Sequence, residues 1–286
     1  MSKRMYVTLD TEMDCDTCWG RPWPATFTSV VEGVPKIYRP IWNKYDVHPI
    51  YFVSPEVLYS PECCEILKCE MEQGAQIGAH LHYEYIEPNK VWDKRVEDIN
   101  SGFPCMALPI EEEYEKIKNL TYLIREKLGI SPVWYRAARF GARPATYEIL
   151  KKLGYKFDSS VTPGINWTSK GGPDYRGYRN APYQISDGIK EYPITIEGKR
   201  WGILGNFLPD NWLFYKWLRP TNMTYYEIKN IIRRKSIAEE DIVMMFHSME
   251  VMINKTPYVR NEWMKRYYVW RLDHSLGCAK RQGYLL

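Results

Sequence analysis

Short apolar segments alternate with longer amphipathic segments along much of the chain. The apolar runs Met5–Leu9, Ile50–Val53 and Ile242–Phe246 have the length and the residue types of buried β-strands. Further strands are predicted at Ile77–His82, Val133–Tyr135, Tyr155–Phe157 and Glu191–Ile196.

Helical patterns separate these strands. Ser60 and Pro61 supply an N-cap and a first-turn proline for a helix that Gly74 ends. A second helix ends at Gly129 and repeats its inward positions at steps of three and four residues, at Tyr114, Ile117, Thr121, Ile124 and Leu128. Helices are also predicted from Pro144 to Gly154, from Asn222 to Lys235 and over Trp263–Leu272. Strands that alternate with helices in this way predict an α/β fold with a parallel sheet, open or closed.

Polar side chains follow the predicted strands at their carboxyl ends. They are Asp10, the pair His80 and His82, Arg136, Asp158 and His247. The carboxyl ends of parallel strands meet at one edge of the sheet, which is where parallel α/β folds build their active sites. We therefore expect these residues to lie close together.

Composition narrows the classes of function. With no internal repeat or linker, the 286 residues are predicted to form a single domain, 1–286. A mixed net charge of +4 argues against a nucleic-acid partner, and no segment is apolar enough to span a membrane. No signal peptide is recognisable, so we expect a cytoplasmic protein with seven unpaired Cys. Cys15 and Cys18 form a CxxC without the usual redox or zinc context, and their role stays open.

Carboxylates and histidines at the predicted edge suggest a metal site. His80 and His82 project to the same side of an extended segment, and two imidazoles with one carboxylate form a three-ligand site with open positions. Asp10, Glu12 and Glu84 are the candidates for that carboxylate. Asp14 and Asp16 are predicted to be solvated loop residues.

Arginines, aromatic residues and a further histidine complete the candidate chemistry. Arg136 and Arg139 are suited to orienting carboxylates or holding an anionic group, in an apolar setting suggested by Trp134. A histidine that ends so apolar a strand as Ile242–Phe246 needs a partner, which fits His247 as a general acid. No Gly-x-Ser-x-Gly motif and no glycine-rich phosphate loop is present.

At these residues the chain resembles the polysaccharide deacetylase family, which is carbohydrate esterase family four with the NodB-homology domain. The resemblance covers nearly the whole chain and rests on six segments in order: Thr8–Glu12, Ile77–His82, Arg136–Gly141, Phe157–Val161, Glu191–Pro193 and Phe246–Ser248. Thr11 separates two acids that are adjacent in most of the family, and Glu84 stands where the second histidine is usual. Ala137 and Ala138 replace prolines, so the chain is similar to a divergent Asp-Thr-Glu and His-Leu-His branch.

The resemblance implies a distorted (β/α) barrel with about seven strands. It also implies a hydrolase that removes an N-acetyl group from an amino sugar or glycan precursor, with a divalent metal ion, Zn²⁺, as cofactor. Glu12, His80 and His82 would hold the metal, Asp10 oriented by Arg136 would be the base, and His247 the acid. The substrate contacts implied at this edge are Arg139, Asp158 and Trp134.

Two other functions remain open from the sequence. One is a metal-free hydrolase of C–N bonds with the same fold. The other is a catalytically silent carbohydrate-binding protein that uses its many aromatic residues, 11 Trp and 23 Tyr among them, as a binding surface.

Overall fold

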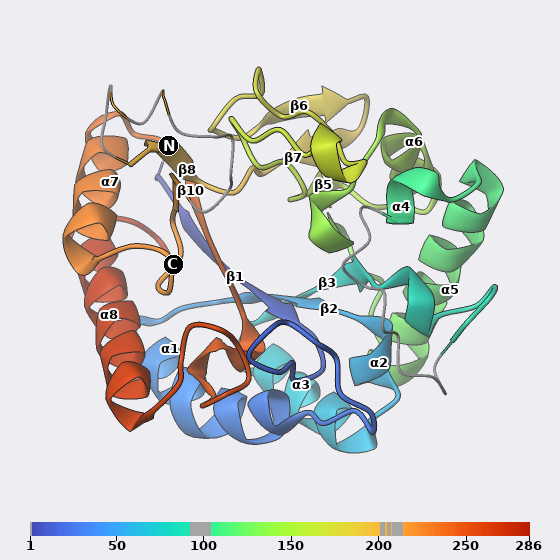
Figure 1. Cartoon of the computed structure of the whole chain (residues 1–286), viewed down its shortest axis with the longest axis horizontal. Coiled ribbons are helices and arrows are strands. Elements are labelled where there is room, and N and C mark those ends of the chain that lie inside the picture. Colours follow the sequence, from blue (N-terminus) through green and yellow to red (C-terminus); the bar gives the residue numbers. More distant parts are fainter. Residues whose placement is uncertain (1, 92–103, 201–203, 205–206, 208–213) are drawn as a thin grey trace.

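A curved, largely parallel sheet runs through the centre of the computed structural model, which describes residues 2–91, 104–200, 204, 207 and 214–286 (Figure 1). The strands follow one another in the order β10-β1-β2-β3-β4-β5-β7-β6. Only β6 is antiparallel to its neighbour. Their bounds are β10 Ile242–His247, β1 Met5–Thr11, β2 Ile50–Val53, β3 Gln76–Leu81, β4 Trp134–Ala137, β5 Phe157–Asp158, β7 Ile189–Glu191 and β6 Tyr183–Ser186. The seven parallel strands confirm the predicted distorted (β/α) barrel.

Helices cover the outside of the curved sheet (Figure 1). The longer ones are η1 Ser29–Tyr38, α1 Arg39–Tyr45, α3 Pro61–Glu72, α5 Ile110–Leu128, α6 Pro144–Lys152, α7 Tyr225–Ile237 and α8 Glu262–Arg281. Short turns of helix are α2 Pro55–Leu58, η2 Tyr83–Tyr85, α4 Pro104–Ala107, η3 Ala138–Phe140, η4 Thr168–Lys170 and η7 Ser248–Val251. The predicted capping residue Ser60 accepts a hydrogen bond from the backbone N–H of Cys63, and Gly129 ends α5 with a positive φ of 74°.

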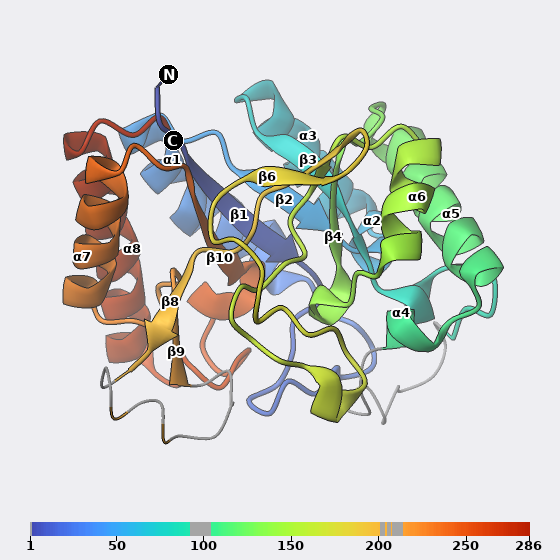
Figure 2. The same ribbon diagram turned by 90° about the horizontal axis from the view of Figure 1, so that it is seen from above.

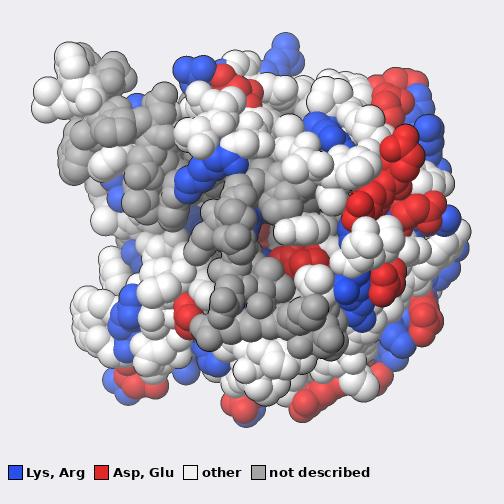
Figure 3. Space-filling view, turned by 45° about the vertical axis from the view of Figure 1, so that its right-hand side comes forward, with Lys and Arg blue, Asp and Glu red and all other residues white. Residues whose placement is uncertain are grey.

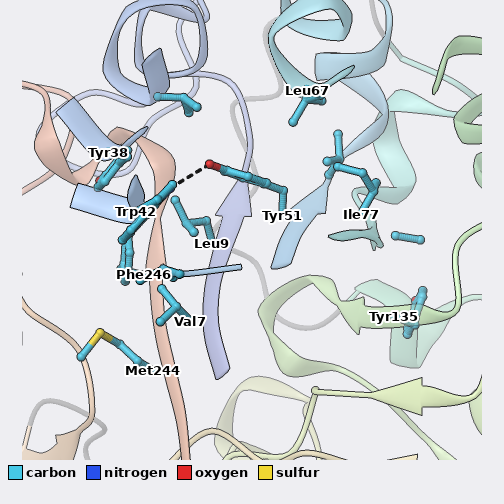
Figure 4. Packing of buried hydrophobic residues seen from close by; sticks show 14 of the residues in the cluster. Val7, Leu9, Tyr38, Trp42, Tyr51, Leu67, Ile77, Tyr135, Met244 and Phe246 are labelled. Carbon is cyan, nitrogen blue, oxygen red and sulfur yellow. Dashed lines mark hydrogen bonds between the residues drawn. The ribbon is translucent and has the colours of Figure 1, made fainter. Parts of the chain in front are cut away.

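The main core lies between the sheet and this helical layer. Alternate residues of the central strands, such as Val7, Leu9 and Phe246, point outward into it (Figure 4). Trp42 of α1 packs there and donates a hydrogen bond from its indole N–H to the hydroxyl of Tyr51, at 3.0 Å. The other alternate residues point into the barrel, and these include the polar groups of the candidate site.

The barrel is completed by a crossing segment rather than by a regular strand. Glu191–Ile196 is predicted as one strand, but β7 ends at Glu191 and a second hairpin, β8 Ile196–Lys199 with β9 Tyr215–Trp217, begins five residues later. Pro193 has no N–H to continue a ladder. Thr195 instead hydrogen-bonds to the backbone of Val243 in β10, the strand at the opposite end of the strand order. The chain after β7 therefore crosses the opening of the curved sheet and reaches β10.

Charge and hydropathy of the described part agree with the composition. Acidic and basic side chains lie next to one another over the face that Figure 3 shows. In the same described residues, no helix has both the length and the apolar character that crossing a bilayer requires.

Candidate active site

The parallel strands of the sheet end at one edge, which we call the carboxyl edge (Figure 2). The strand register places the predicted polar residues at this edge. In the strand register Asp10 is level with His247, and His80 is level with Arg136. Asp158 is level with Tyr135, one residue before Arg136. The convergence expected from the sequence is therefore present for the residues that end strands.

Arg136 fixes Asp10. Its guanidinium is fully buried and lies 2.5 Å from Oδ1 of Asp10, and it also donates to Thr8, to the Ser159 hydroxyl and to the Ser159 carbonyl. The aromatic face of Phe52 lies 4.1 Å from the guanidinium carbon. Burial alone would raise the pKa of Asp10, but Arg136, and then His80 and His247, hold it below the ordinary value. Asp10 is therefore an oriented, ionised carboxylate.

Glu12 is the centre of the site because it contacts all three histidines of the carboxyl edge. Its Oε1 lies 3.5 Å from Nε2 of His80 and 3.4 Å from Nε2 of His247, while its Oε2 lies 3.5 Å from Nε2 of His82. Burial would raise the pKa of Glu12, yet the imidazoles of His82 and His80 hold it well below its usual range.

The outer nitrogen of His80 faces a backbone carbonyl, and that of His82 lies within ion-pair distance of a carboxylate. Nδ1 of His80 lies 2.9 Å from the carbonyl oxygen of Arg136, which favours a proton on Nδ1 and a lone pair on Nε2. Nδ1 of His82 lies 3.2 Å from Oε1 of Glu56. Burial and Arg21 oppose a charged His82, but the carboxylates of Glu12 and Glu56 outweigh them and raise its pKa to about 9.

This arrangement fits a divalent metal ion. The ligand atoms of Glu12, His80 and His82 all lie within 4.8 Å of one another. Tetrahedral bonds of about 2.1 Å would place ligand atoms about 3.4 Å apart, close to the 3.5 Å between Glu12 and each of these histidines. Carbonyl and carboxylate acceptors behind the imidazoles are the usual support of histidine metal ligands. Asp10, Glu12 and His247 form a second possible group, whereas Glu84 belongs to neither.

His247 faces the same space from the other side. Its Nε2 lies 4.0 Å from Oδ2 of Asp10, and its Nδ1 lies 3.2 Å from Oε1 of Glu250 and 3.0 Å from Nη2 of Arg219. The indole ring of Trp19 lies 4.9 Å from the imidazole ring. The His247 side chain is 16% exposed, more than that of Asp10, Glu12 or the other two histidines, so it is the most accessible of these five side chains.

The three predicted substrate contacts lie in different settings. Asp158 is fully buried, and one of its carboxylate oxygens accepts a hydrogen bond from the hydroxyl of Ser160. Arg139 is partly exposed in η3, with a positive φ of 52°. Trp134 begins β4, at the end of the strand opposite the carboxyl edge, and packs in an aromatic cluster with Phe157 and Tyr192. The structure therefore does not bring Trp134 to the site.

Four charged residues of the site were not identified from the sequence: Arg21, Glu56, Arg219 and Glu250. Glu56 and Glu250 follow β2 and β10 by three residues, so the same strand-end reasoning had a signal for them. Arg21 and Arg219 come from segments without regular periodicity, where the sequence gives no comparable signal.

Two expectations about the loop after β1 can also be compared with the structure. Asp14 is fully buried and accepts hydrogen bonds from the backbone N–H groups of Thr28 and Ser29, so the prediction of a solvated residue is wrong for Asp14. Cys15 and Cys18 are free thiols. Burial raises the pKa of the Cys15 thiol, which makes it a poor redox nucleophile.

Comparison with known proteins agrees with the fold. No protein-family model and no curated protein sequence matches the chain. Over 99% of its length it is similar to a solved structure from Mycobacterium smegmatis described as a polysaccharide deacetylase, covering 87% of that chain with 13% identity and a TM-score of 0.55. A family 4 carbohydrate esterase from Streptomyces lividans has 8% identity and a TM-score of 0.49, and the match covers 99% of this chain and 90% of that chain. The peptidoglycan deacetylase PdaC from Bacillus subtilis has 13% identity and a TM-score of 0.45, and the match covers 100% of this chain and 87% of that chain. The first likeness confirms the resemblance to polysaccharide deacetylases at the level of the fold.

Proposed function

We propose that the protein is a metal-dependent hydrolase that removes the N-acetyl group of an amino sugar, free or in a glycan precursor. The observation that carries this proposal is the contact of one carboxylate, Glu12, with His80, His82 and His247 beside the Asp10–Arg136 pair. A three-ligand group next to an oriented carboxylate and an accessible histidine suits hydrolysis of an amide.

Glu12, His80 and His82 would hold the metal ion, which we expect to be Zn²⁺. When bound, the ion would polarise the acyl carbonyl and lower the pKa of water. Asp10 acts as the base in this scheme. Its Oδ1 is held by Arg136, and its Oδ2 lies toward His247, so Oδ2 is the atom that takes the proton of the attacking water. A water and an amide are converted to a carboxylate and an amine.

His247 acts as the acid that protonates the departing amine. Nε2 faces the space beside Asp10 and Glu12, while Nδ1 contacts Glu250, which is suited to stabilising the protonated ring. Arg219 neutralises the charge of Glu250 and keeps the pair in place. A general base and a general acid each contribute about a hundredfold to ten-thousandfold to such a reaction.

Acetate release from N-acetylglucosamine and its short oligomers tests this proposal. The protein is stripped of metal with a chelator and then assayed with and without added Zn²⁺, alongside the His80→Ala, His82→Ala double variant. We expect activity that depends on Zn²⁺ in the wild type and neither bound metal nor turnover in the double variant. His274→Ala, at a partly exposed position on α8, is the matched control and should behave as the wild type. Full turnover in the double variant would contradict the proposal.

A further inference from the structure

A buried arginine lies inside the proposed metal site. The Arg21 side chain is only 9% exposed. Its Nη1 forms an ion pair with Oε1 of Glu84, and its Nη2 lies 3.6 Å from Oε2 of Glu12 and 3.4 Å from Nε2 of His82. The ring of Tyr85 lies 5.5 Å from the guanidinium carbon.

The atoms that Arg21 approaches are atoms that the metal needs. Glu12 and His82 belong to the group that fits a divalent ion. Oε2 of Glu12 and Nε2 of His82 lie 3.5 Å apart, and the same nitrogen of Arg21 approaches both atoms. An arginine has donors and no acceptor, and it stays charged in a protein. Nη2 of Arg21 therefore places a positive charge beside Oε2 of Glu12 and Nε2 of His82, where a metal ion bound to these two residues would also lie. The guanidinium and the ion compete for the same place.

Arg21 is held in this place by the loop that carries it. Oδ1 of Asp16 accepts hydrogen bonds of 2.7 Å from the backbone N–H groups of both Cys18 and Gly20, which shapes the turn just before Arg21. A Cβ at Gly20 would lie 2.5 Å from the Asp16 carboxylate, so any larger residue there would push this carboxylate out of its place in the turn. Glu84, in η2 directly after the two histidines, holds the other end of the side chain.

We propose that Arg21 is a resident cation that competes with the divalent metal ion for Glu12 and His82. This inference rests on the metal site of the proposed function. In the metal-free protein the guanidinium compensates the buried charge of Glu12, and metal binding displaces it from these two ligands toward Glu84. The site therefore binds metal more weakly, and releases it more readily, than Glu12, His80 and His82 would without Arg21.

The affinity for Zn²⁺ tests this directly, measured by competition with a chromogenic chelator at constant pH and without substrate. We expect Arg21→Gln to bind Zn²⁺ about tenfold more tightly than the wild type or better, because a positive charge next to the ion is removed. Arg21→Lys, which keeps the charge, should lie between the two. Arg39→Gln, which removes an arginine paired with the buried Glu70 elsewhere in the molecule, is the control and should match the wild type.

The double variant Arg21→Gln, Glu84→Gln separates competition for ligand atoms from a simple change in charge. It removes one positive and one negative group, so the net charge is kept and Glu84 is not left as a buried carboxylate without Arg21. Glu12 loses Arg21 but keeps its contacts with the three histidines. We expect the double variant to bind Zn²⁺ more tightly than the wild type does. If thermal unfolding shows that Arg21→Gln alone does not fold, the double variant takes its place in the affinity measurement.

Wild-type affinity in both glutamine variants would overturn the inference while leaving the metal site intact, as would weaker binding. If only the double variant returned to the wild-type affinity, charge alone would explain the effect and competition for the ligands would be wrong. If neither the wild type nor any variant bound Zn²⁺, the ligand assignment of the proposed function would fail, and the inference with it.

Discussion

Two pairs of buried carboxyl groups lie at the carboxyl edge and differ in what surrounds them. Asp10 and Glu12 belong to the end of β1, whereas Asp158 ends β5 and Glu191 ends β7. No side chain of the four residues lies in an exposed position, since the largest relative exposure is 6%, at Glu12. Burial alone raises the pKa of all four groups.

Neighbouring cations decide which of these groups is charged. Arg136 and the histidines reverse the effect of burial for the first pair and lower the pKa of Asp10 and of Glu12. Asp158 and Glu191 act mainly on each other's pKa. Burial raises the pKa of Glu191 well above its ordinary value, and the charge of Asp158 raises it further. Position at a strand end therefore does not by itself make a carboxyl group reactive, because its partners set its charge.

The largest expected effect comes from exchanging Asp10 for its neutral isostere. Asp10→Asn should lower kcat on an N-acetylated amino sugar by about a hundredfold or more, because the base is lost. Metal content should stay close to that of the wild type. Steady-state kinetics and elemental analysis measure the two quantities, and Glu12→Gln should show the reverse order, with metal lost first.

Asp158→Asn is the matched control for Asp10→Asn, since it makes the same change in the other pair. It should leave kcat close to the wild-type value, because Asp158 is enclosed and hydrogen-bonded to Ser160. Equal losses of kcat in the two variants would show that both pairs take part in the reaction. Loss of the metal in Asp10→Asn would make Asp10 a ligand instead of the base.

His247→Asn tests the acid that faces the charged pair. We expect kcat on an amide substrate to fall by about a hundredfold, because the departing amine needs a proton. An activated aryl ester, whose leaving group needs no proton, should be affected much less. Equal losses on the amide and on the ester would indicate a structural role for His247.

The position of Asp10 and Glu12 beside their partners could largely be predicted from the sequence. The bounds of β2, Ile50–Val53, agree with the prediction, and the strands that carry Asp10, Arg136 and His247 were also predicted. Parallel strands meet at one edge, so residues that end them converge whatever their separation along the chain. This geometric rule located the strand-end residues of the site without any knowledge of the helices.

What the rule could not supply was the partner of each group. Asp158 and Asp10 look alike in sequence, since each directly follows an apolar strand segment. In the structure Asp10 forms an ion pair with Arg136, whereas Asp158 accepts a hydrogen bond from Ser160. Trp134 looks like a site residue because it precedes Arg136, but strand direction places it at the other end of β4. Arg21 reaches Glu84, 63 residues later in the chain, from an irregular loop. Contacts of this kind depend on tertiary structure and leave no periodic pattern.

The pH dependence of stability tests the same comparison at a further buried acid, Glu250, which is paired with a cation. Burial would raise its pKa, but Arg219 outweighs burial and lowers the pKa to about 2 from an ordinary value of 4.5. The group is more acidic in the folded protein, so its contribution to stability is present above the ordinary value and is lost as the pH falls. We expect the difference in free energy of unfolding between wild type and Glu250→Gln to shrink by about 2 kcal/mol from about pH 6 to pH 3. Urea denaturation at each pH measures this difference, and a constant difference would contradict the lowered pKa.

Glu191→Gln should have the smallest effect and the opposite dependence on pH. Burial and the charge of Asp158 raise the pKa of Glu191 well above its ordinary value, so the folded protein favours the neutral, protonated form of Glu191, which glutamine resembles in charge and shape. The amide oxygen can still accept from the backbone N–H of Val161, as Oε1 of Glu191 does at 3.0 Å. The free energy of unfolding near pH 7 should therefore stay within about 1 kcal/mol of the wild type.

The sign of the pH dependence is the stricter part of this last prediction. A raised pKa means that folding takes up a proton at Glu191, so the wild type loses stability as the pH rises above the ordinary value of 4.5, and Glu191→Gln does not. Urea denaturation from acidic to alkaline pH should therefore show the variant gaining on the wild type as the pH increases. Glu250→Gln should show the wild type gaining on the variant over the acidic part of the same series. If both variants changed in the same direction, the two kinds of carboxyl group would not differ in charge, and the contrast between cation-paired and mutually paired acids at this edge would be wrong.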